Sequence, residues 1–244
     1  MAIKIRSSKV IANKGGVKIG VHSSAGMGKT MLAATCPKPV VILTERTGAD
    51  CLSPENIKSV WGKAKGITYD IPIIEAYTAT DICEAIDYCR ASNEYETVVF
   101  DSVSEMSKIR LKDELPKHKN AMQAYGVLAI DVDNLMREMR DDPKNWVWLF
   151  HSDKEDIYND EGEASATQFV PGFEGQKMNN EFPHLVGDVY CLVSEFDEEG
   201  VEKRMLRTRT GDTAFYAKNR RGRLDELETP HMGSIFWKLK SKSK

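Results

Sequence analysis

The chain has 244 residues, of which 41% are hydrophobic and 29% are charged, and its formal net charge at pH 7 is −3. These values are ordinary for a globular protein with a full core and argue against extensive disorder, and the small net charge gives no overall attraction to nucleic acid. The length suits one large α/β domain or two small ones, and because no linker-like segment divides the chain we predict one domain.

The five cysteines form no C-x-x-C pair, and the five histidines complete no metal-ligand spacing. The first 14 residues are interrupted by basic side chains and lack the apolar stretch of a signal peptide. No apolar run approaches the length needed to span a membrane. We therefore expect a cytoplasmic protein with buried free thiols and no membrane partner.

In chain order, residues 1–16 are predicted to form an N-terminal arm or an edge strand, ending in the Gly15-Gly16 turn. An alternating apolar run, Val17 to His22, then predicts the first core strand, and the run from Met31 to Cys36 predicts a helix. Between these two elements the sequence SSAGMGKT resembles a phosphate-binding loop, usually G-x-x-x-x-G-K-[ST].

Small residues in such a loop let successive backbone N–H groups face a polyphosphate, and the helix that follows adds the positive end of its dipole. Lys29 would reach the outer phosphates and Thr30 a Mg²⁺ ion. Ser23 takes the place of the first glycine, so a flexible turn with an incidental Lys-Thr pair stays open as an alternative. The predicted nucleotide-binding residues are Ser24, Ala25, Gly26, Met27, Gly28, Lys29, Thr30 and Met31.

After two prolines, Val40 to Leu43 form a continuous apolar run typical of a strand buried on both faces of a parallel sheet, with Glu45 just beyond its end. Residues 47–66 give no clear pattern, and residues 71–74 favour a short strand. A helix is expected over residues 81–91, with Asp81 and Glu84 forming a start like a capping box.

The run from Thr97 to Ser102 predicts a buried strand that ends in Asp101. In phosphate-loop enzymes a carboxylate at this place supports the Mg²⁺ ion opposite the loop's threonine. The alternative is that Asp101 caps the helix that follows.

Helices are predicted over residues 104–115 and 121–140, with a short basic stretch between them that forms a solvated turn or faces a polyanion. The next buried strand, residues 146–150, brings His151 to the sheet edge where Glu45 and Asp101 are expected. For His151 a phosphate-sensing role and a purely structural role remain equally open.

Residues 153–183 are polar and lack periodicity, which predicts a long loop that is functional or disordered. A β-hairpin is expected from residues 188–194 and 203–209 around the turn at Gly200, followed by a last strand over residues 214–217. Residues 238–244 form a short basic tail.

Five features, in this order along the chain, resemble the RecA-like ATPases of bacteriophages: GMGKT, the glutamate past the second strand, VVFDS, WLFHS and AKNRRGRL. The similarity is closest to the Sak-type single-strand annealing ATPases of phages, which have a reduced RecA/RadA-type core. It covers residues 17–224 and implies a RecA-like ATPase domain there, with a C-terminal segment over residues 225–244. The implied fold is α/β, a three-layer P-loop NTPase with a mostly parallel central sheet and a C-terminal β-hairpin.

The resemblance also implies roles. Lys29 and Thr30 would bind the phosphates and Mg²⁺, Asp101 would support the metal, and Glu45 matches the carboxylate that polarises the attacking water. The alternative for Glu45 is a surface ion pair with Arg46 or a nearby lysine.

Lys218 and Arg220 resemble the basic pair that RecA-like subunits insert into a neighbour's ATP site. This implies a homo-oligomer, a ring or a filament, with ATP sites at its subunit interfaces. The charges alone fit equally well a DNA-backbone patch made of Arg220, Arg221 and Arg223.

In RecA-like recombinases the DNA-binding loops follow the two strands that here end at Asp101 and His151, which points to residues 112–126 and 153–183. The second segment is rich in acids, which argues against tight autonomous DNA binding. Its three phenylalanines either stack on bases or fold the segment onto the core: Phe169, Phe173 and Phe182.

The function expected from the sequence is a Mg²⁺-dependent ATPase that binds single-stranded DNA and promotes annealing or recombination as an oligomer. A single-strand DNA-binding protein is a further candidate partner. Two other functions stay open: a P-loop kinase, and a module in which ATP orders the subunits without significant turnover.

Overall fold

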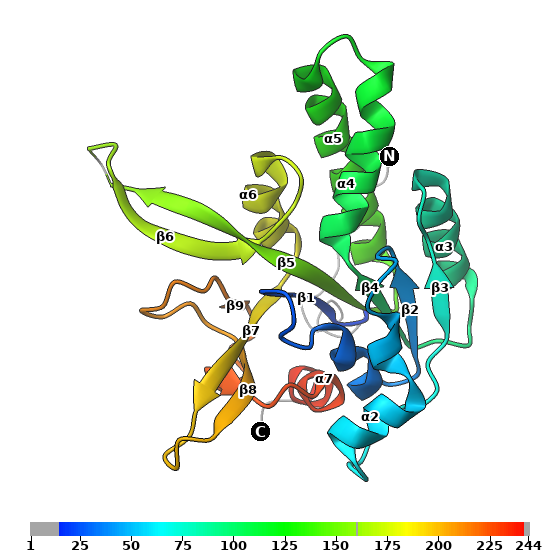
Figure 1. The fold of residues 1–244 in the computed structure, drawn as a ribbon, viewed down its shortest axis with the longest axis vertical. Coiled ribbons are helices and arrows are strands. Elements are labelled where there is room, and N and C mark those ends of the chain that lie inside the picture. Colours follow the sequence, from blue (N-terminus) through cyan, green and yellow to red (C-terminus); the bar gives the residue numbers. More distant parts are fainter. Residues whose placement is uncertain (1–14, 160, 242–244) are drawn as a thin grey trace, which may run out of the picture.

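The computed structural model describes residues 15–159 and 161–241 (Figure 1). Most of the predicted N-terminal arm, residues 1–14, and the last three residues of the basic tail lie outside the described residues. Within the described part of the chain, no helix is long and apolar enough to cross a membrane.

Six parallel strands form the centre of the sheet, in the spatial order β3-β2-β4-β5-β1-β7. Their bounds are β1 Lys18–Ser23, β2 Pro39–Leu43, β3 Ile73–Glu75, β4 Thr97–Asp101, β5 Asn145–Tyr158 and β7 Asp188–Phe196. The strand between β1 and β4 in space is β5, which carries His151. The mostly parallel sheet predicted from the apolar runs is confirmed.

At the β7 end of the sheet the strands pair in antiparallel fashion. β8 (Glu202–Arg207) forms the predicted hairpin with β7, and β10 (Leu227–Glu228) pairs with β8. The predicted last strand over residues 214–217 is displaced, because the ladder with β7 is formed by β9 (Lys218–Asn219). Before it, only an isolated bridge joins Phe215 to Phe169 among the described residues.

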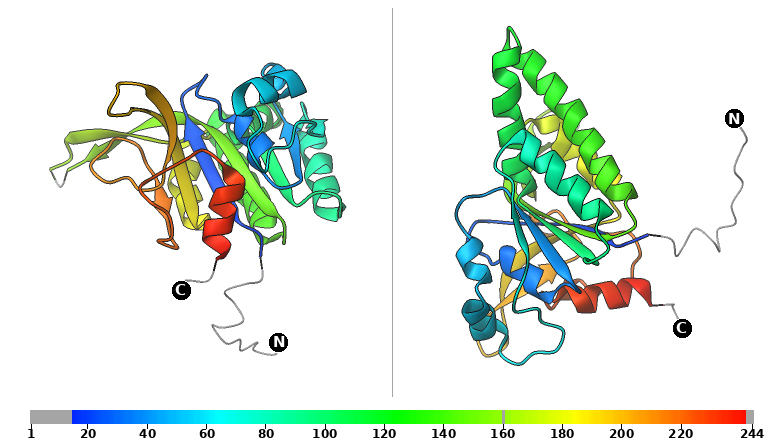
Figure 2. Two further views of the ribbon diagram at one scale, coloured as in Figure 1. Left: turned by 90° about the horizontal axis from the view of Figure 1, so that it is seen from below. Right: turned by 90° about the vertical axis from the view of Figure 1, so that its right-hand side faces the viewer.

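Helices cover both faces of the sheet, which gives three layers (Figure 2). One face carries α3 (Ala79–Ala91), α4 (Val103–Glu114), α5 (Ala121–Asp141) and α6 (Gln176–Leu185), and a short 3₁₀ turn, η3 (Leu115–Lys117), follows α4. The other face carries η1 (Thr30–Thr35), η2 (Ala49–Leu52), α2 (Pro54–Trp61) and α7 (Met232–Lys240).

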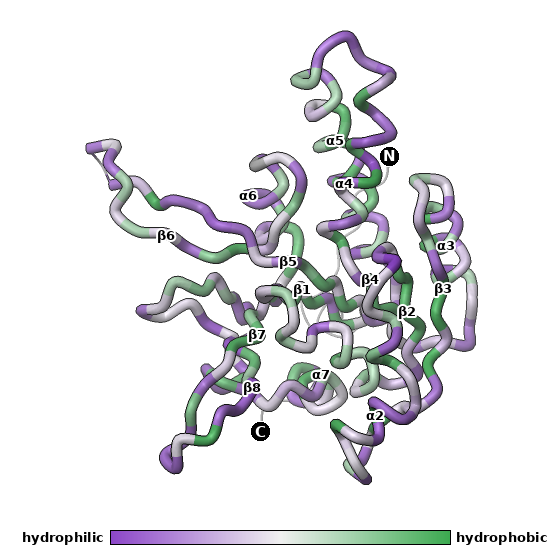
Figure 3. Tube along the Cα trace, in the orientation of Figure 1, coloured by the Kyte–Doolittle hydropathy of each residue, from purple (hydrophilic) through white to green (hydrophobic). Residues whose placement is uncertain are grey.

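The core strands are apolar on both faces because each face is covered by helices. In β4, Val98 and Phe100 pack toward α3, α4 and α5, whereas Val99 packs toward the η1 face. Figure 3 shows the hydrophobic residues gathered in these central strands and hydrophilic residues at the tip of the α4–α5 pair. The three-layer α/β fold of a P-loop NTPase, predicted from the sequence, is therefore confirmed.

Two helices differ in detail from the predictions. The helix after the loop is a six-residue 3₁₀ helix, η1, because the chain returns to an extended conformation at Cys36, just before Pro37. The start of α3 is a capping box made by Thr78 and Asp81, in which each side chain accepts a hydrogen bond from the other residue's backbone N–H. The predicted pairing of Asp81 with Glu84 is wrong.

The predicted loop over residues 153–183 is also wrong. β5 continues to Tyr158 and pairs antiparallel with β6 (Ala164–Pro171), and α6 follows. The outer part of this hairpin is exposed on both faces, so its sequence carries no apolar alternation from which a strand could be predicted. It projects from the body as a mostly hydrophilic arm (Figures 1 and 3).

Replacing Gly16 by alanine is expected to lower the free energy of unfolding by about 2 kcal/mol or more. A Cβ atom at Gly16 would lie 1.8 Å from the carbonyl oxygen of Lys144, so the backbone before β5 would have to move. Gly15→Ala is the matched control, because a Cβ there meets no atom within 4 Å. Urea unfolding of both variants measures the difference, and equal midpoints would contradict the close approach.

Candidate nucleotide site

Four neighbouring strands deliver the predicted site residues to one edge of the sheet. β1 ends in the loop, β5 continues into His151, β4 ends at Asp101, and Glu45 follows β2 by two residues. Ser23 pairs in register with His151, and Leu43 pairs with Asp101. The carboxyl ends of parallel strands are the usual ligand position in open α/β sheets.

The loop has the backbone conformation that its glycines permit. Gly26 and Gly28 have φ angles of 79° and 93°, in the region that side chains disfavour. Among the described non-glycine residues, a positive φ angle occurs at Lys38 and not at Ser23. Serine at the position of the first glycine therefore imposes no backbone strain.

The Lys29 ammonium group lies inside the turn of the loop. Its Nζ donates to the carbonyl oxygens of Ser23 and Ser24, at 2.9 and 3.0 Å, and to the Ser23 hydroxyl at 3.2 Å. Burial lowers the pKa of Lys29, while the nearby Asp101 and Glu45 oppose that shift. Both the carbonyl oxygens and these carboxylates favour a cation at this position, which is where the sequence motif places the phosphate-binding lysine.

Thr30 and Asp101 meet across the edge between η1 and β4. The Thr30 hydroxyl donates to Asp101 Oδ2 at 2.5 Å. Burial raises the pKa of Asp101 to about 6, and the bond from Thr30 opposes that rise. A buried carboxylate beside a hydroxyl is a donor set of hard oxygens, which suits Mg²⁺.

This pair is too small to hold a metal ion alone. In the described part of the chain, no group of three or more His, Cys, Asp or Glu side chains is arranged around a common point. Mg²⁺ generally keeps several waters and binds through one or two protein ligands together with substrate phosphates. Thr30 and Asp101 thus fit a metal ion that arrives with a nucleotide.

Glu45 is held by two donors on the same oxygen. Ser102 Oγ donates to Glu45 Oε1 at 2.6 Å, and His151 Nε2 lies 2.8 Å from the same atom. The bond to His151 is the main reason that the pKa of Glu45 is lowered to about 2. Glu45 is therefore a fixed carboxylate at neutral pH, and Oε2 remains available to a further group.

The ends of β2 and β4 are tied together beneath Glu45. The Thr44 hydroxyl donates to the carbonyl oxygen of Ser102 at 2.9 Å and accepts from the Ser102 N–H at 3.0 Å. Ser102 also caps α4, since its hydroxyl accepts from the N–H of Glu105. These bonds fix the distance between Glu45 and the strand that carries Asp101.

Lys218 and Arg220 do not lie with the other predicted residues. β9 pairs with the first residues of β7, which is toward the opposite edge of the sheet from the loop. Lys218 Nζ donates to the carbonyl oxygens of Pro183 and Val186 at 2.5 and 3.2 Å, and Arg220 is exposed. A role for this pair in ATP hydrolysis thus requires the site of another subunit.

His22 is a buried polar residue of this region that the sequence did not single out. Its Nε2 lies 2.7 Å from the carbonyl oxygen of Tyr216, and its Nδ1 lies 2.8 Å from the Ser152 hydroxyl. A carbonyl oxygen only accepts, so Nε2 carries the proton and Nδ1 accepts from Ser152. Its position at the end of an apolar strand, directly before the loop, was the available signal.

Protonation of His22 is expected to destabilise the fold. Burial lowers its pKa from 6.5 to about 4, so between these values the unfolded chain binds more protons than the folded chain. The stabilisation is complete above about pH 6.5 and is lost as the pH falls. Between about pH 7.5 and about pH 5 the loss is about 2 kcal/mol.

Urea unfolding at these two pH values, on the natural chain and on His22→Gln, measures this contribution. The glutamine variant should lose less stability on acidification than the natural chain. An identical loss in both would assign the acid sensitivity to other groups.

A cleft of about 550 Å³ opens beside Glu45 and His151. Three cationic side chains line it, Arg46 after β2 and Lys108 and Lys112 on α4. Arg46 lies over the ring of Tyr77, at 4.7 Å from its centre, and makes no ion pair with Glu45 among the described residues. The alternative of a surface pair between Glu45 and Arg46 is therefore not supported.

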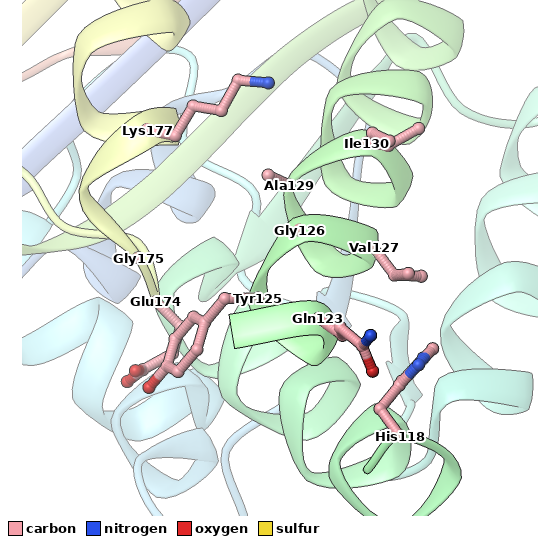
Figure 4. A pocket seen from close by; sticks show the side chains of 10 residues that line it. All are labelled: His118, Gln123, Tyr125, Gly126, Val127, Ala129, Ile130, Glu174, Gly175 and Lys177. Atoms are coloured by element: carbon pink, nitrogen blue, oxygen red, sulfur yellow. The ribbon is translucent and has the colours of Figure 1, made fainter. Parts of the chain in front are cut away.

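A second pocket, of about 970 Å³, lies between α5 and the start of α6 (Figure 4). Its wall includes Tyr125, Val127 and Ile130, with Lys177 on the opposite side. The nucleotide-loop residues do not line it, so it is separate from the candidate site.

A family model described as an AAA domain matches residues 15–221, which includes the loop, all six parallel strands and the β7–β8 hairpin. No curated protein matches the chain.

Proposed function

We propose a function for this chain on the basis that it belongs to the AAA domain family. In this proposal it is a Mg²⁺-dependent ATPase, and single-stranded DNA stimulates its activity. Membership of this family indicates a P-loop ATPase that binds nucleotide. The further parts of the proposal are DNA binding, annealing or recombination of the phage type, and assembly into a ring or filament.

The residues at the sheet edge divide the work of hydrolysis. Lys29 and the loop backbone would bind the phosphates, and Thr30 and Asp101 would hold the metal ion. Bound Mg²⁺ neutralises part of the negative charge on the phosphates. His151 and Ser102 both bind Oε1 of Glu45, which leaves Oε2 to accept a hydrogen bond from water.

The low pKa of Glu45, about 2, makes it a weak base. We therefore assign it the task of orienting the attacking water, since a carboxylate of low pKa gains little by accepting a full proton. His151, on β5, contacts Glu45 through its Nε2 atom. A phosphate group that attracts the His151 ring would therefore change the position of Glu45. This supports the phosphate-sensing role of His151.

The observation that carries the DNA part of the proposal is the cationic cleft beside Glu45. Arg46 and Lys112 make no ion pair among the described residues, and both face the same cleft as Glu45 and His151. Uncompensated cations attract the phosphates of a nucleic acid. A strand bound there would lie next to the group that orients water, which gives a direct route for stimulation.

The β5–β6 hairpin supports DNA binding less well. Acidic side chains predominate on its exposed part, and the three phenylalanines of residues 153–183 are mostly unavailable for stacking on bases. Phe173 and Phe182 are buried in the core beside Phe150, and Phe169 stacks on Phe215. We therefore place the DNA in the cleft lined by α4 and not along the hairpin.

The test is ATP hydrolysis with and without single-stranded DNA, on the natural chain and on an Arg46→Ala, Lys112→Ala double variant. We expect DNA to stimulate the natural chain and to stimulate the double variant several-fold less. Lys58→Ala is the matched control, because Lys58 is exposed on α2 and does not line the cleft. Equal stimulation in all three would remove the cleft from the proposal.

A small anionic acceptor would also fit beside these cations, which favours a P-loop kinase as the second candidate. The products distinguish the two functions, because a kinase transfers the phosphoryl group to the acceptor and an ATPase releases inorganic phosphate. Nucleotide-dependent assembly without phosphate release would indicate a module that ATP only orders.

For the oligomer we propose that Lys218 and Arg220 act on the ATP site of a neighbouring subunit. Lys218 would have to exchange its contacts with the end of α6 for phosphate oxygens. Arg221 and Arg223 donate to the carbonyl oxygen of Leu239 at the end of α7, so they are less available for a DNA-backbone patch. Mixing a Lys218→Ala, Arg220→Ala variant with Glu45→Gln subunits should restore some turnover, and no recovery would weaken this assignment.

A further inference from the structure

The β7–β8 hairpin extends past the end of β1 and lies beside the phosphate-binding loop. The last residue pair that joins β1 to β7 is His22 with Cys191, and β7 continues to Phe196. On the returning strand, Arg204 pairs with Ser194, beyond the end of β1. The hairpin therefore carries Arg204 to the level of the loop.

The alternation of β8 sets the direction of Arg204. Leu206, two residues further on, is buried in the core on the η1 face of the sheet. Side chains two apart in a strand share a face, so Arg204 lies on the same face as the loop and η1. A Cβ atom built on Gly28 would lie 2.6 Å from Nη1 of Arg204, which shows that the guanidinium group lies against the loop.

Arg204 differs from its neighbours on β8 in having no acidic partner among the described residues. Lys203 pairs with Asp197 at 2.7 Å, and Arg207 pairs with Glu195 and Glu226 at 2.8 and 2.7 Å. Among the described residues, Arg204 is thus the cation of this strand that has no acidic partner.

At the loop itself, the ammonium group of Lys29 faces two carboxylates, Asp101 and Glu45. The cations Arg46, Lys108 and Lys112 line the cleft beside Glu45 and His151, which no residue of the loop lines. A nucleoside triphosphate brings several further negative charges, of which a divalent cation cancels only part. A second protein cation near the loop would complete the balance.

We propose that Arg204 is a phosphate-binding residue that each subunit supplies to its own nucleotide site. This inference rests on the proposed binding of ATP at the loop, and it is distinct from the role of Lys218 and Arg220, which act between subunits. The planar guanidinium group donates two parallel hydrogen bonds to phosphate oxygens, so arginine suits this task better than lysine. In this position Arg204 links the hairpin to the nucleotide.

The first test compares the ATP affinity of Arg204→Ala, Arg204→Lys and the matched control Lys203→Ala, using displacement of a fluorescent ATP analogue. Loss of a charged hydrogen-bond donor is expected to weaken binding about tenfold or more in Arg204→Ala, with a smaller loss in Arg204→Lys. Lys203→Ala should bind as the natural chain does. An unchanged melting temperature excludes misfolding as the cause.

Lys29→Ala separates this inference from the proposed function. If the natural chain binds ATP and Lys29→Ala does not, the nucleotide site stands. In that case an Arg204→Ala variant with the affinity of Lys203→Ala overturns the role of Arg204 alone. If the natural chain itself fails to bind ATP, the proposed function fails first.

The second test asks which subunit supplies Arg204. When Arg204→Ala subunits are mixed with Lys29→Ala subunits, no subunit has both residues in its own site. Supply within one subunit therefore predicts no recovery of ATP turnover in the mixture. Recovery would overturn the inference, because it would show that Arg204 serves the site of a neighbour.

Discussion

Replacing Lys29 by alanine is expected to lower ATP turnover by about a hundredfold or more, since removal of one donor to the reacting phosphate has effects of this size. Lys29 is the ammonium group inside the loop, held at 2.9 to 3.2 Å from three oxygen atoms of Ser23 and Ser24. Its loss removes the charge that would meet the outer phosphates. Phosphate release at saturating Mg²⁺ and ATP measures the effect.

The same contacts make a loss of loop order the main competing explanation. Lys29→Met keeps most of the side-chain volume while removing the charge, so it separates packing from electrostatics. Both variants should lose turnover, and thermal unfolding should show that the methionine variant keeps its fold. Turnover equal to that of the natural chain in Lys29→Ala would remove the loop from the proposed site.

Replacing Glu45 by glutamine is expected to lower the rate of hydrolysis by about 10² to 10⁴, while the affinity for ATP changes little. The amide oxygen still accepts from Ser102 and His151, so the side chain stays in place. The charge that orients the attacking water is lost. Single-turnover hydrolysis and equilibrium binding of ATP, measured on the same preparation, give the two quantities.

Glu84→Gln is the control, because Glu84 is an exposed glutamate on α3. It should affect neither quantity. If Glu45→Gln instead lost binding and hydrolysis to the same extent, Glu45 would be a structural residue that shapes the end of β2.

The central strands and the loop were predictable from local sequence. Residues 40–43 and 98–100 are apolar at every position, which is the pattern of a strand buried on both faces. The loop was predictable because its glycines and its Lys-Thr pair are consecutive in the chain. Asp101 and Glu45 were predictable as candidates because Asp101 ends such a strand and Glu45 lies two residues beyond another.

The outer part of β5 and the whole of β6 were not predictable in this way. Asp153, Lys154 and Asp156 are exposed on a ribbon whose strands are joined by backbone hydrogen bonds. No apolar face marks such a ribbon, so composition alone indicates a loop. Similarly, the capping box of α3 begins at Thr78, three residues before the predicted helix over residues 81–91, and Thr78 is polar and gives no periodic signal.

By itself the sequence determined the α/β class, the parallel core and the loop, because these depend on residues that are adjacent in the chain. Only the tertiary structure decided that Glu45 is bound to His151 and Ser102, that Thr30 meets Asp101, and that Arg204 lies against Gly28. These contacts join residues separated by 57 to about 180 positions, so they depend on strand order and register. Pairing along the sheet fixes both, and the spacing of residues in the sequence carries neither.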